Sequence, residues 1–115
     1  MITVLVDEGY AYDYLSILYV KNNFFKNPKT EEAQKACEEH ISNQVGEDKH
    51  AKIISSNEFK NMYDVNLKTF NAVEKARYGK ISAKEVDNLN MDRYKMKILL
   101  QNKFFPGIEV SESKS

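Results

Sequence analysis

Residues 77–85 have the sequence RYGKISAKE, and this short stretch decides the fold. Gly79 is the residue type that ends a helix, because glycine adopts the left-handed backbone conformation without a side-chain clash. Ser82 and Glu85 form the Ser-x-x-Glu pattern that begins a helix. Two residues separate these signals. A connection this short predicts that the helices on either side lie antiparallel, as a helical hairpin.

Apolar residues recur at helical spacing on both sides of this turn. Ser55 and Glu58 form an earlier Ser-x-x-Glu pattern, so we expect the first long helix over about residues 57–78. The second is expected over about residues 82–104, before Pro106. The apolar positions that support the two helices are Phe59, Met62, Leu67, Phe70, Val73, Val86, Leu89, Ile98 and Leu100.

Further helices are expected before the hairpin. One is predicted from Tyr10 to Phe25. Thr30 is the expected N-cap of a second, amphipathic helix that ends at Gly46. Residues 47–54 favour a short helix over a strand.

The N-terminus carries the single strand signal of the chain. Residues 2–6 are apolar and mostly β-branched, and they predict a short strand. A lone strand needs a partner, which would be residues 108–110 or another subunit. The expected fold is therefore mostly α: one small helical domain over residues 1–107, followed by a largely disordered polar tail at residues 108–115.

The composition suits one globular domain. The 115 residues are 42% hydrophobic and 30% charged, which argues against wholesale disorder. Cys37 stands alone, so we expect a reducing cytoplasm and no intrachain disulfide. Neither a targeting segment nor a membrane-spanning segment is expected.

The net charge is zero, but the charges are unevenly distributed. Residues 1–48 carry nine acids against four bases, and residues 49–115 carry thirteen bases against eight acids. This dipolar pattern is compatible with head-to-tail association.

Acidic residues follow the predicted strand. Asp7, Glu8 and Asp13 are oxygen ligands of the kind that Mg²⁺ prefers. The stretch VLVDEGYAYDYL, residues 4–15, resembles the opening of PIN-type ribonucleases, where an apolar strand runs into an aspartate and then a helix. That resemblance implies a metal-dependent nuclease built on a parallel sheet, and this chain shows no later central strand. The favoured interpretation is that Asp7 and Glu8 cap a helix, where acids are favoured.

Cys37 and His40 share one helix face, with His50 further along the chain. With this spacing they could be two of the ligands of a zinc site, or a Cys–His nucleophile pair. A structural zinc site needs four ligands, and the chain has no second cysteine. A buried thiol on an amphipathic helix is the favoured interpretation, and we expect neither a metal nor a cofactor.

Basic residues recur along the second half of the chain. A face of this kind would attract a phosphate backbone. Acids are mixed with the bases and no known nucleic-acid-reading motif is present, so a solvated helix face is favoured over a nucleic-acid accessory surface. The candidate nucleic-acid contacts are Lys80, Lys84, Arg93, Lys95 and Lys97.

Tyrosines crowd the first predicted helix at Tyr10, Tyr12, Tyr14 and Tyr19. They cannot all point in one direction, and tyrosine is enriched at protein interfaces. The leading hypothesis is a small non-enzymatic interaction or regulatory module that binds itself or another protein. The alternatives are a metal-dependent nuclease using the acidic residues and a nucleic-acid accessory protein using the basic face.

Overall fold

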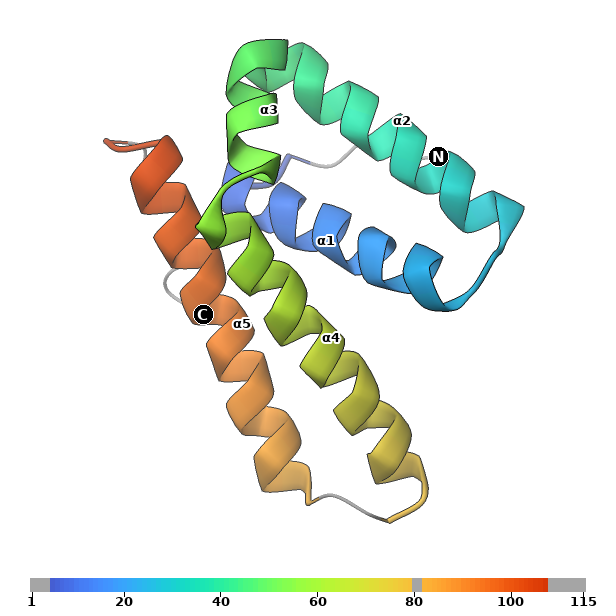
Figure 1. Cartoon of the computed structure of the whole chain (residues 1–115). Helices are drawn as coiled ribbons and strands as arrows, with labels where there is room; N and C mark the ends of the chain where they lie inside the picture. The colour runs from blue at the N-terminus through green and yellow to red at the C-terminus, as the bar shows by residue number, and fades with distance from the viewer. Residues whose placement is uncertain (1–4, 80–81, 108–115) are drawn as a thin grey trace.

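The computed structural model describes residues 5–79 and 82–107 of the chain, and these residues form five helices (Figure 1). The helices are α1 (Glu8–Phe24), α2 (Pro28–Val45), α3 (Glu47–Ile54), α4 (Asn57–Arg77) and α5 (Ala83–Phe104). The mostly α fold is thereby confirmed, and α3 confirms the short helix expected at residues 47–54. Among these five helices, none combines the length and the apolar character that crossing a bilayer requires.

Helices α4 and α5 form the predicted hairpin and lie side by side in antiparallel directions (Figure 1). Gly79 has a φ of 69°, the left-handed conformation expected at the end of α4. The Ser82 hydroxyl accepts a hydrogen bond from the backbone N–H of Glu85 at 3.2 Å and caps α5. Local signals around the turn were therefore sufficient to predict this part of the fold.

Two other helix starts differ from the prediction. The hydroxyl of Ser56, and not that of Ser55, accepts the capping hydrogen bond from the N–H of Phe59 at 3.1 Å. Ser55 instead donates to carbonyl oxygens at the end of α3. The side chain of Asn27 caps α2 in place of Thr30, because the proline that follows Asn27 already begins the first turn.

The predicted N-terminal strand is not supported. Leu5 and Val6 form no strand, and the described part of the chain contains no other strand with which they could pair. The rest of the predicted strand, together with residues 108–110, lies outside the described residues.

The core forms where α1, α2 and α3 pack against the half of the hairpin that is remote from its turn (Figure 1). The other half of the hairpin projects beyond them. Helix α1 is central, because it contacts α2, α4 and α5. The main buried cluster consists of Tyr12, Leu15, Ile41, Ile53, Phe59, Met62, Leu100 and Phe105.

Helix α1 approaches α5 closely at Gly9. The backbone N–H of Gly9 donates a hydrogen bond to Gln101 Oε1 at 2.6 Å. A Cβ atom at this position would lie 2.6 Å from the carbonyl oxygen of Lys97, closer than real Cβ contacts allow. The absence of a side chain at Gly9 therefore lets the first turn of α1 rest on the α5 backbone.

Gly9→Ala should destabilise the protein, although glycine-to-alanine changes in exposed helices stabilise by up to about 1 kcal/mol. The new methyl group meets backbone atoms, so we expect the free energy of unfolding to fall by about 1–3 kcal/mol. Urea unfolding followed by circular dichroism measures the change. Asn88→Ala, at an exposed position of α5, is the control and should shift stability by less than about 0.5 kcal/mol. A Gly9→Ala protein as stable as the parent would contradict the close approach.

Candidate interaction site

The solvent-facing side of α1 carries large apolar side chains. With 3.6 residues per turn, positions 10, 14, 17, 21 and 24 fall within a sector of about 80°. Tyr10 is 39% exposed, Tyr14 50% and Phe24 53%. Ile17, which is partly buried, and Lys21 complete the row. We call Tyr10, Tyr14, Ile17, Lys21 and Phe24 the α1 stripe.

Helix α5 borders the first half of the α1 stripe. A shallow pocket of about 320 Å³ lies between the two helices. The ammonium of Lys97 lies 5.0 Å from the centre of the Tyr10 ring, within cation–π range. The pocket is lined by Tyr10, Asp13, Tyr14, Ile17, Asn90, Arg93 and Lys97.

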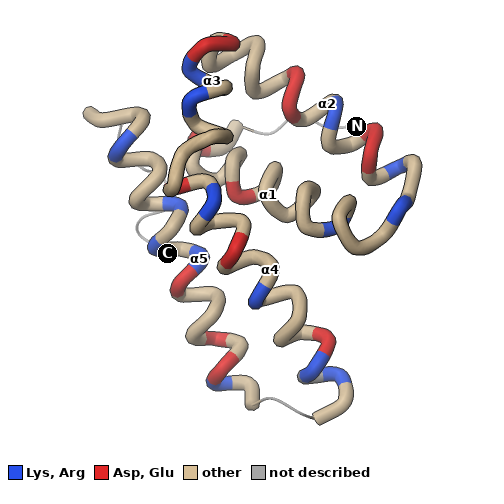
Figure 2. Tube along the Cα trace, viewed as in Figure 1, with Lys and Arg blue, Asp and Glu red and all other residues tan. Residues whose placement is uncertain are grey.

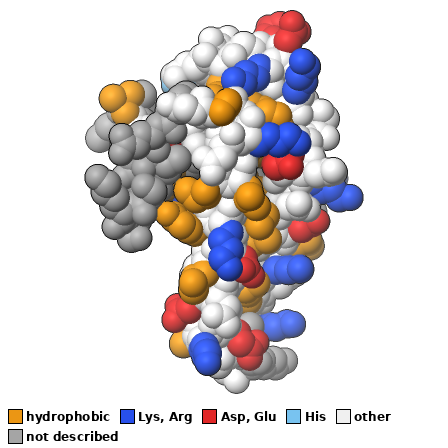
Figure 3. All heavy atoms as spheres, turned by 90° about the vertical axis from the view of Figure 1, so that its left-hand side faces the viewer, with side chains coloured by type: hydrophobic (Ala, Val, Ile, Leu, Met, Phe, Trp, Pro, Cys, Tyr) orange, Lys and Arg blue, Asp and Glu red, His pale blue; other side chains and the backbone are white. Residues whose placement is uncertain are grey.

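Further exposed apolar residues lie on the hairpin. On α5, Met91 is 59% exposed and Leu99 55%, and Leu99 faces Glu58 and Asn61 of α4 and not α1. Figure 3 shows hydrophobic side chains grouped between Lys and Arg side chains on the face that carries α5. At the other end of the α1 stripe, the Phe24 ring stacks on Phe70 of α4 at 6.0 Å between centroids, and Phe25 meets the same ring at 5.8 Å. At this end the apolar surface thus continues from α1 onto α4.

A buried polar junction holds α1 in this orientation. Asp13 is 4% exposed. One of its carboxylate oxygens accepts from Asn66 Nδ2 at 2.9 Å, and the other pairs with the Arg93 guanidinium at 3.0 Å. Asn66 also donates to the Ser16 hydroxyl at 2.6 Å. These four residues, which we call the Asp13 junction, join α1 to α4 and α5 at one point.

The four tyrosines predicted as an interface separate into two pairs. Tyr10 and Tyr14 are exposed on the α1 stripe. Tyr12 is fully buried, and its hydroxyl pairs with His50 Nδ1 at 2.8 Å. The Tyr19 hydroxyl donates a hydrogen bond to Glu38 at 2.7 Å, and the Tyr19 side chain packs against the core. Tyr12 is therefore a core residue and is removed from the predicted interface.

Tyr12 and Tyr19 belong to a second polar network on the opposite side of α1. His50 Nε2 lies 3.2 Å from Glu38 Oε1, so both tyrosines connect to this one carboxylate, Tyr12 through His50. Burial, together with the negative charge of Glu38, raises the pKa of Tyr12 and of Tyr19 well above the ordinary tyrosine value. Both phenols keep their protons at neutral pH, and the network ties α1 to α2 and α3.

The acidic residues proposed as metal ligands are used in other ways. The Asp13 carboxylate is already bound by Asn66 and Arg93 within the Asp13 junction. Glu8 accepts a hydrogen bond from the Gln101 side chain at 3.1 Å, and Asp7 lies at the N-cap position of α1. Across residues 5–79 and 82–107, no group of three or more His, Cys, Asp or Glu side chains is placed to hold a metal ion.

Cys37, His40 and His50 do not form one site. Burial raises the pKa of the Cys37 thiol, with a further contribution from Glu38. His40 is exposed and lies 2.9 Å from the Gln44 amide nitrogen. His50 is buried against Tyr12. A half-buried, protonated thiol agrees with the structural interpretation of Cys37.

The predicted basic face is interrupted. Lys84 and Lys95 are exposed, whereas Arg93 is held by Asp13. Lys97 lies over the Tyr10 ring, and Lys80 lies outside the described residues. Figure 2 shows acidic residues alternating with basic ones along the hairpin. Bases and acids therefore share this surface, which weakens its attraction for a phosphate backbone.

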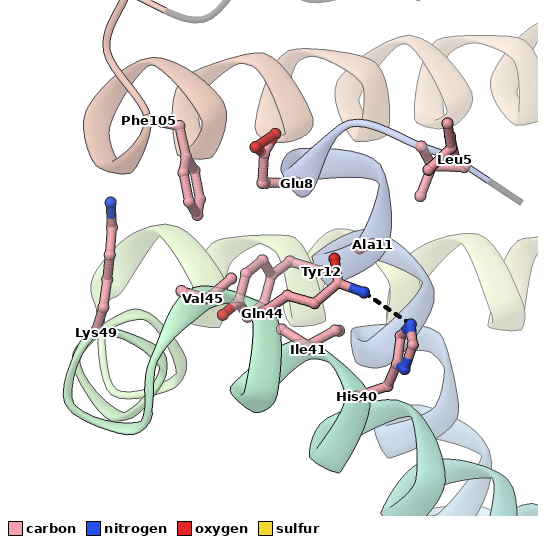
Figure 4. A pocket seen from close by; sticks show the side chains of 11 residues that line it. Leu5, Glu8, Ala11, Tyr12, His40, Ile41, Gln44, Val45, Lys49 and Phe105 are labelled. Carbon is pink, nitrogen blue, oxygen red and sulfur yellow. Dashed lines mark hydrogen bonds between the residues drawn. The ribbon is translucent and has the colours of Figure 1, made fainter. Parts of the chain in front are cut away.

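A larger pocket opens on the α2 side of α1 and has a volume of about 430 Å³ (Figure 4). Ala11, Ile41, Val45 and Phe105 contribute apolar walls, and Lys49 stands at the rim. By helical geometry, the α1 residues of this pocket project from a different side than the α1 stripe.

Comparison with protein-family models, with curated proteins and with solved structures finds no match for this chain. The site must therefore be judged on its own geometry. Sequence reasoning identified Tyr10 and Tyr14 but missed the Asp13 junction. No local signal could have revealed it, since Asp13 and Arg93 are 80 residues apart.

Arg93→Met tests the Asp13 junction. It leaves the buried carboxylate of Asp13 without its charge partner, and we expect the free energy of unfolding to fall by about 2–3 kcal/mol. Adding Asp13→Asn should recover part of this loss, because the double variant buries no unpaired charge. Urea denaturation of the parent, the two single variants and the double variant gives the coupling energy between Asp13 and Arg93.

Arg77→Met is the matched control. Arg77 pairs with Glu74 at 3.8 Å on the exposed surface, so its loss should change stability by less than about 1 kcal/mol. If Arg93→Met and Arg77→Met lowered the free energy of unfolding equally, the junction would not hold the helices. A coupling energy of zero between Asp13 and Arg93 would lead to the same conclusion.

Proposed function

We propose that this protein is a non-enzymatic interaction module that self-associates through the α1 stripe and the neighbouring face of α5. The observation that carries the proposal is the apolar character of the α1 stripe. A central helix that is buried on its other sides would be expected to face solvent with polar residues. Here the exposed row carries two tyrosines and a phenylalanine beside one lysine, and exposed apolar surface of this kind marks interaction sites.

A second copy of the chain is the partner that this surface suits. The surface holds aromatic rings and cations together, as the contact between Lys97 and Tyr10 demonstrates within one chain. In a twofold dimer each copy would present Lys97 to the tyrosines of the other, so the surface is complementary to itself. Tyrosine is also among the residue types enriched in such interfaces.

The dimensions are compatible with a dimer. The α1 stripe runs from Tyr10 to Phe24, about 21 Å along the helix axis. A standard interface buries about 800 Å² per partner, so the dimer would bury α5 on one flank and Phe70 on the other together with the stripe. We expect the module to work in a reducing cytoplasm, in keeping with its free Cys37.

Sedimentation velocity over a range of protein concentrations tests the proposal. The parent should show a concentration-dependent dimer, and Tyr10→Ser with Tyr14→Ser should weaken it. Central interface tyrosines typically contribute about 2 kcal/mol, so the dissociation constant should rise by about thirtyfold or more.

Tyr78→Ser is the matched control, since Tyr78 is 74% exposed in the turn that follows α4 and lies away from the stripe. Its dissociation constant should equal that of the parent. A parent protein that stays monomeric up to millimolar concentration, or a dimer weakened as much by Tyr78→Ser as by the double variant, would overturn the proposal.

A further inference from the structure

The pocket on the α2 side of α1 has the size and lining of a small-molecule site. Its volume is about 430 Å³, within the range of roughly 300–1,000 Å³ typical of ligand pockets. Ala11 of α1, Ile41 and Val45 of α2, and Phe105 after α5 form apolar walls. The Tyr12 hydroxyl is engaged by His50, so Tyr12 contributes mainly its ring to the lining. Figure 4 shows these side chains arranged around a common space.

One rim of the pocket carries the positive charge of Lys49. The Lys49 ammonium lies 4.3 Å from the centre of the Phe105 ring. No carboxylate in residues 5–79 or 82–107 forms an ion pair with it. Lys49 is exposed, so its charge is available at the mouth while Phe105 turns its ring into the pocket.

The other charged group of the lining is Glu8, on the far side of Phe105 from Lys49 in Figure 4. Its Oε1 accepts the hydrogen bond from Gln101, which holds the carboxylate near α5. Glu8 would repel a second negative charge on a ligand. A ligand with one anionic group beside Lys49 and an apolar body between Phe105, Val45 and Ile41 pairs with the lysine and brings no second negative charge near Glu8.

We infer that this pocket binds a small amphipathic monocarboxylate, with its carboxylate at Lys49 and its apolar body against Ile41, Val45 and Phe105. The site is separate from the α1 stripe and does not depend on self-association. Each methylene that enters the pocket should strengthen binding by about fourfold, until the apolar space is filled.

NMR titration of the full-length protein with octanoate, below the concentration at which octanoate self-associates, tests the inference. We expect saturable shifts of the backbone signals of Ala11, Ile41, Val45, Lys49 and Phe105. Hexanoate should bind more weakly by about sixteenfold, and acetate should give no saturable shift. Octylammonium serves as the cationic comparison and should bind more weakly than octanoate.

Variants that remove single charges test where the carboxylate of octanoate binds. Lys49→Gln should weaken octanoate binding by about fivefold, which is the upper range for an exposed ion pair. Glu8→Gln should leave it unchanged or strengthen it. The matched control is Lys52→Gln, an exposed lysine of the same helix that does not line the pocket, and it should have no effect.

Three outcomes would overturn the inference. The first is the absence of saturable shifts with octanoate, as expected if another part of the chain fills the pocket. The second is shifts centred on the α1 stripe, which indicate nonspecific contact with exposed apolar surface. The third is equal affinity for octanoate and octylammonium, or equal effects of Lys49→Gln and Lys52→Gln.

Discussion

The position of α1 depends on the buried carboxylate of Asp13. Burying a charge is unfavourable unless it is paired and hydrogen-bonded, and Asp13 finds both requirements at the crossing of three helices. Asn66 of α4 and Arg93 of α5 reach it from the two arms of the hairpin. Rotating or sliding α1 would separate Asp13 from at least one partner. The junction therefore specifies one orientation of α1 on the hairpin, which hydrophobic packing alone would define less sharply.

This orientation decides which side chains of α1 meet solvent. Gly9 rests on the α5 backbone, and the network of Tyr12, His50 and Glu38 fastens the opposite side to α2 and α3. The row of Tyr10, Tyr14 and Ile17 is left facing outward. The same helix thus supports two separate surfaces. One is an aromatic and basic stripe that we propose for self-association, and the other is a wall of the pocket that we assign to an amphipathic carboxylate.

The hairpin could be predicted from sequence because its signals are local. Gly79 and Ser82 act within a few residues of their positions, and the structure uses both as expected. The cap of α4 was misplaced by one residue because adjacent serines carry equivalent hydroxyls, and Ser55 is used by the end of α3 instead. The split among the tyrosines could not be predicted. It depends on which sides of α1 are covered, and the residues that cover them are as much as 93 positions away.

Solvent accessibility of individual tyrosines, measured by NMR with an inert paramagnetic agent at low and high protein concentration, tests the account most directly. Tyr12 should be shielded at both concentrations, because the Asp13 junction keeps it inside the fold. Tyr10 and Tyr14 should be accessible in dilute solution and shielded in concentrated solution, whereas Tyr78 should stay accessible in both. Accessible Tyr12 would contradict the orientation of α1. Unchanged accessibility of Tyr10 and Tyr14 on concentration would contradict the proposed interface.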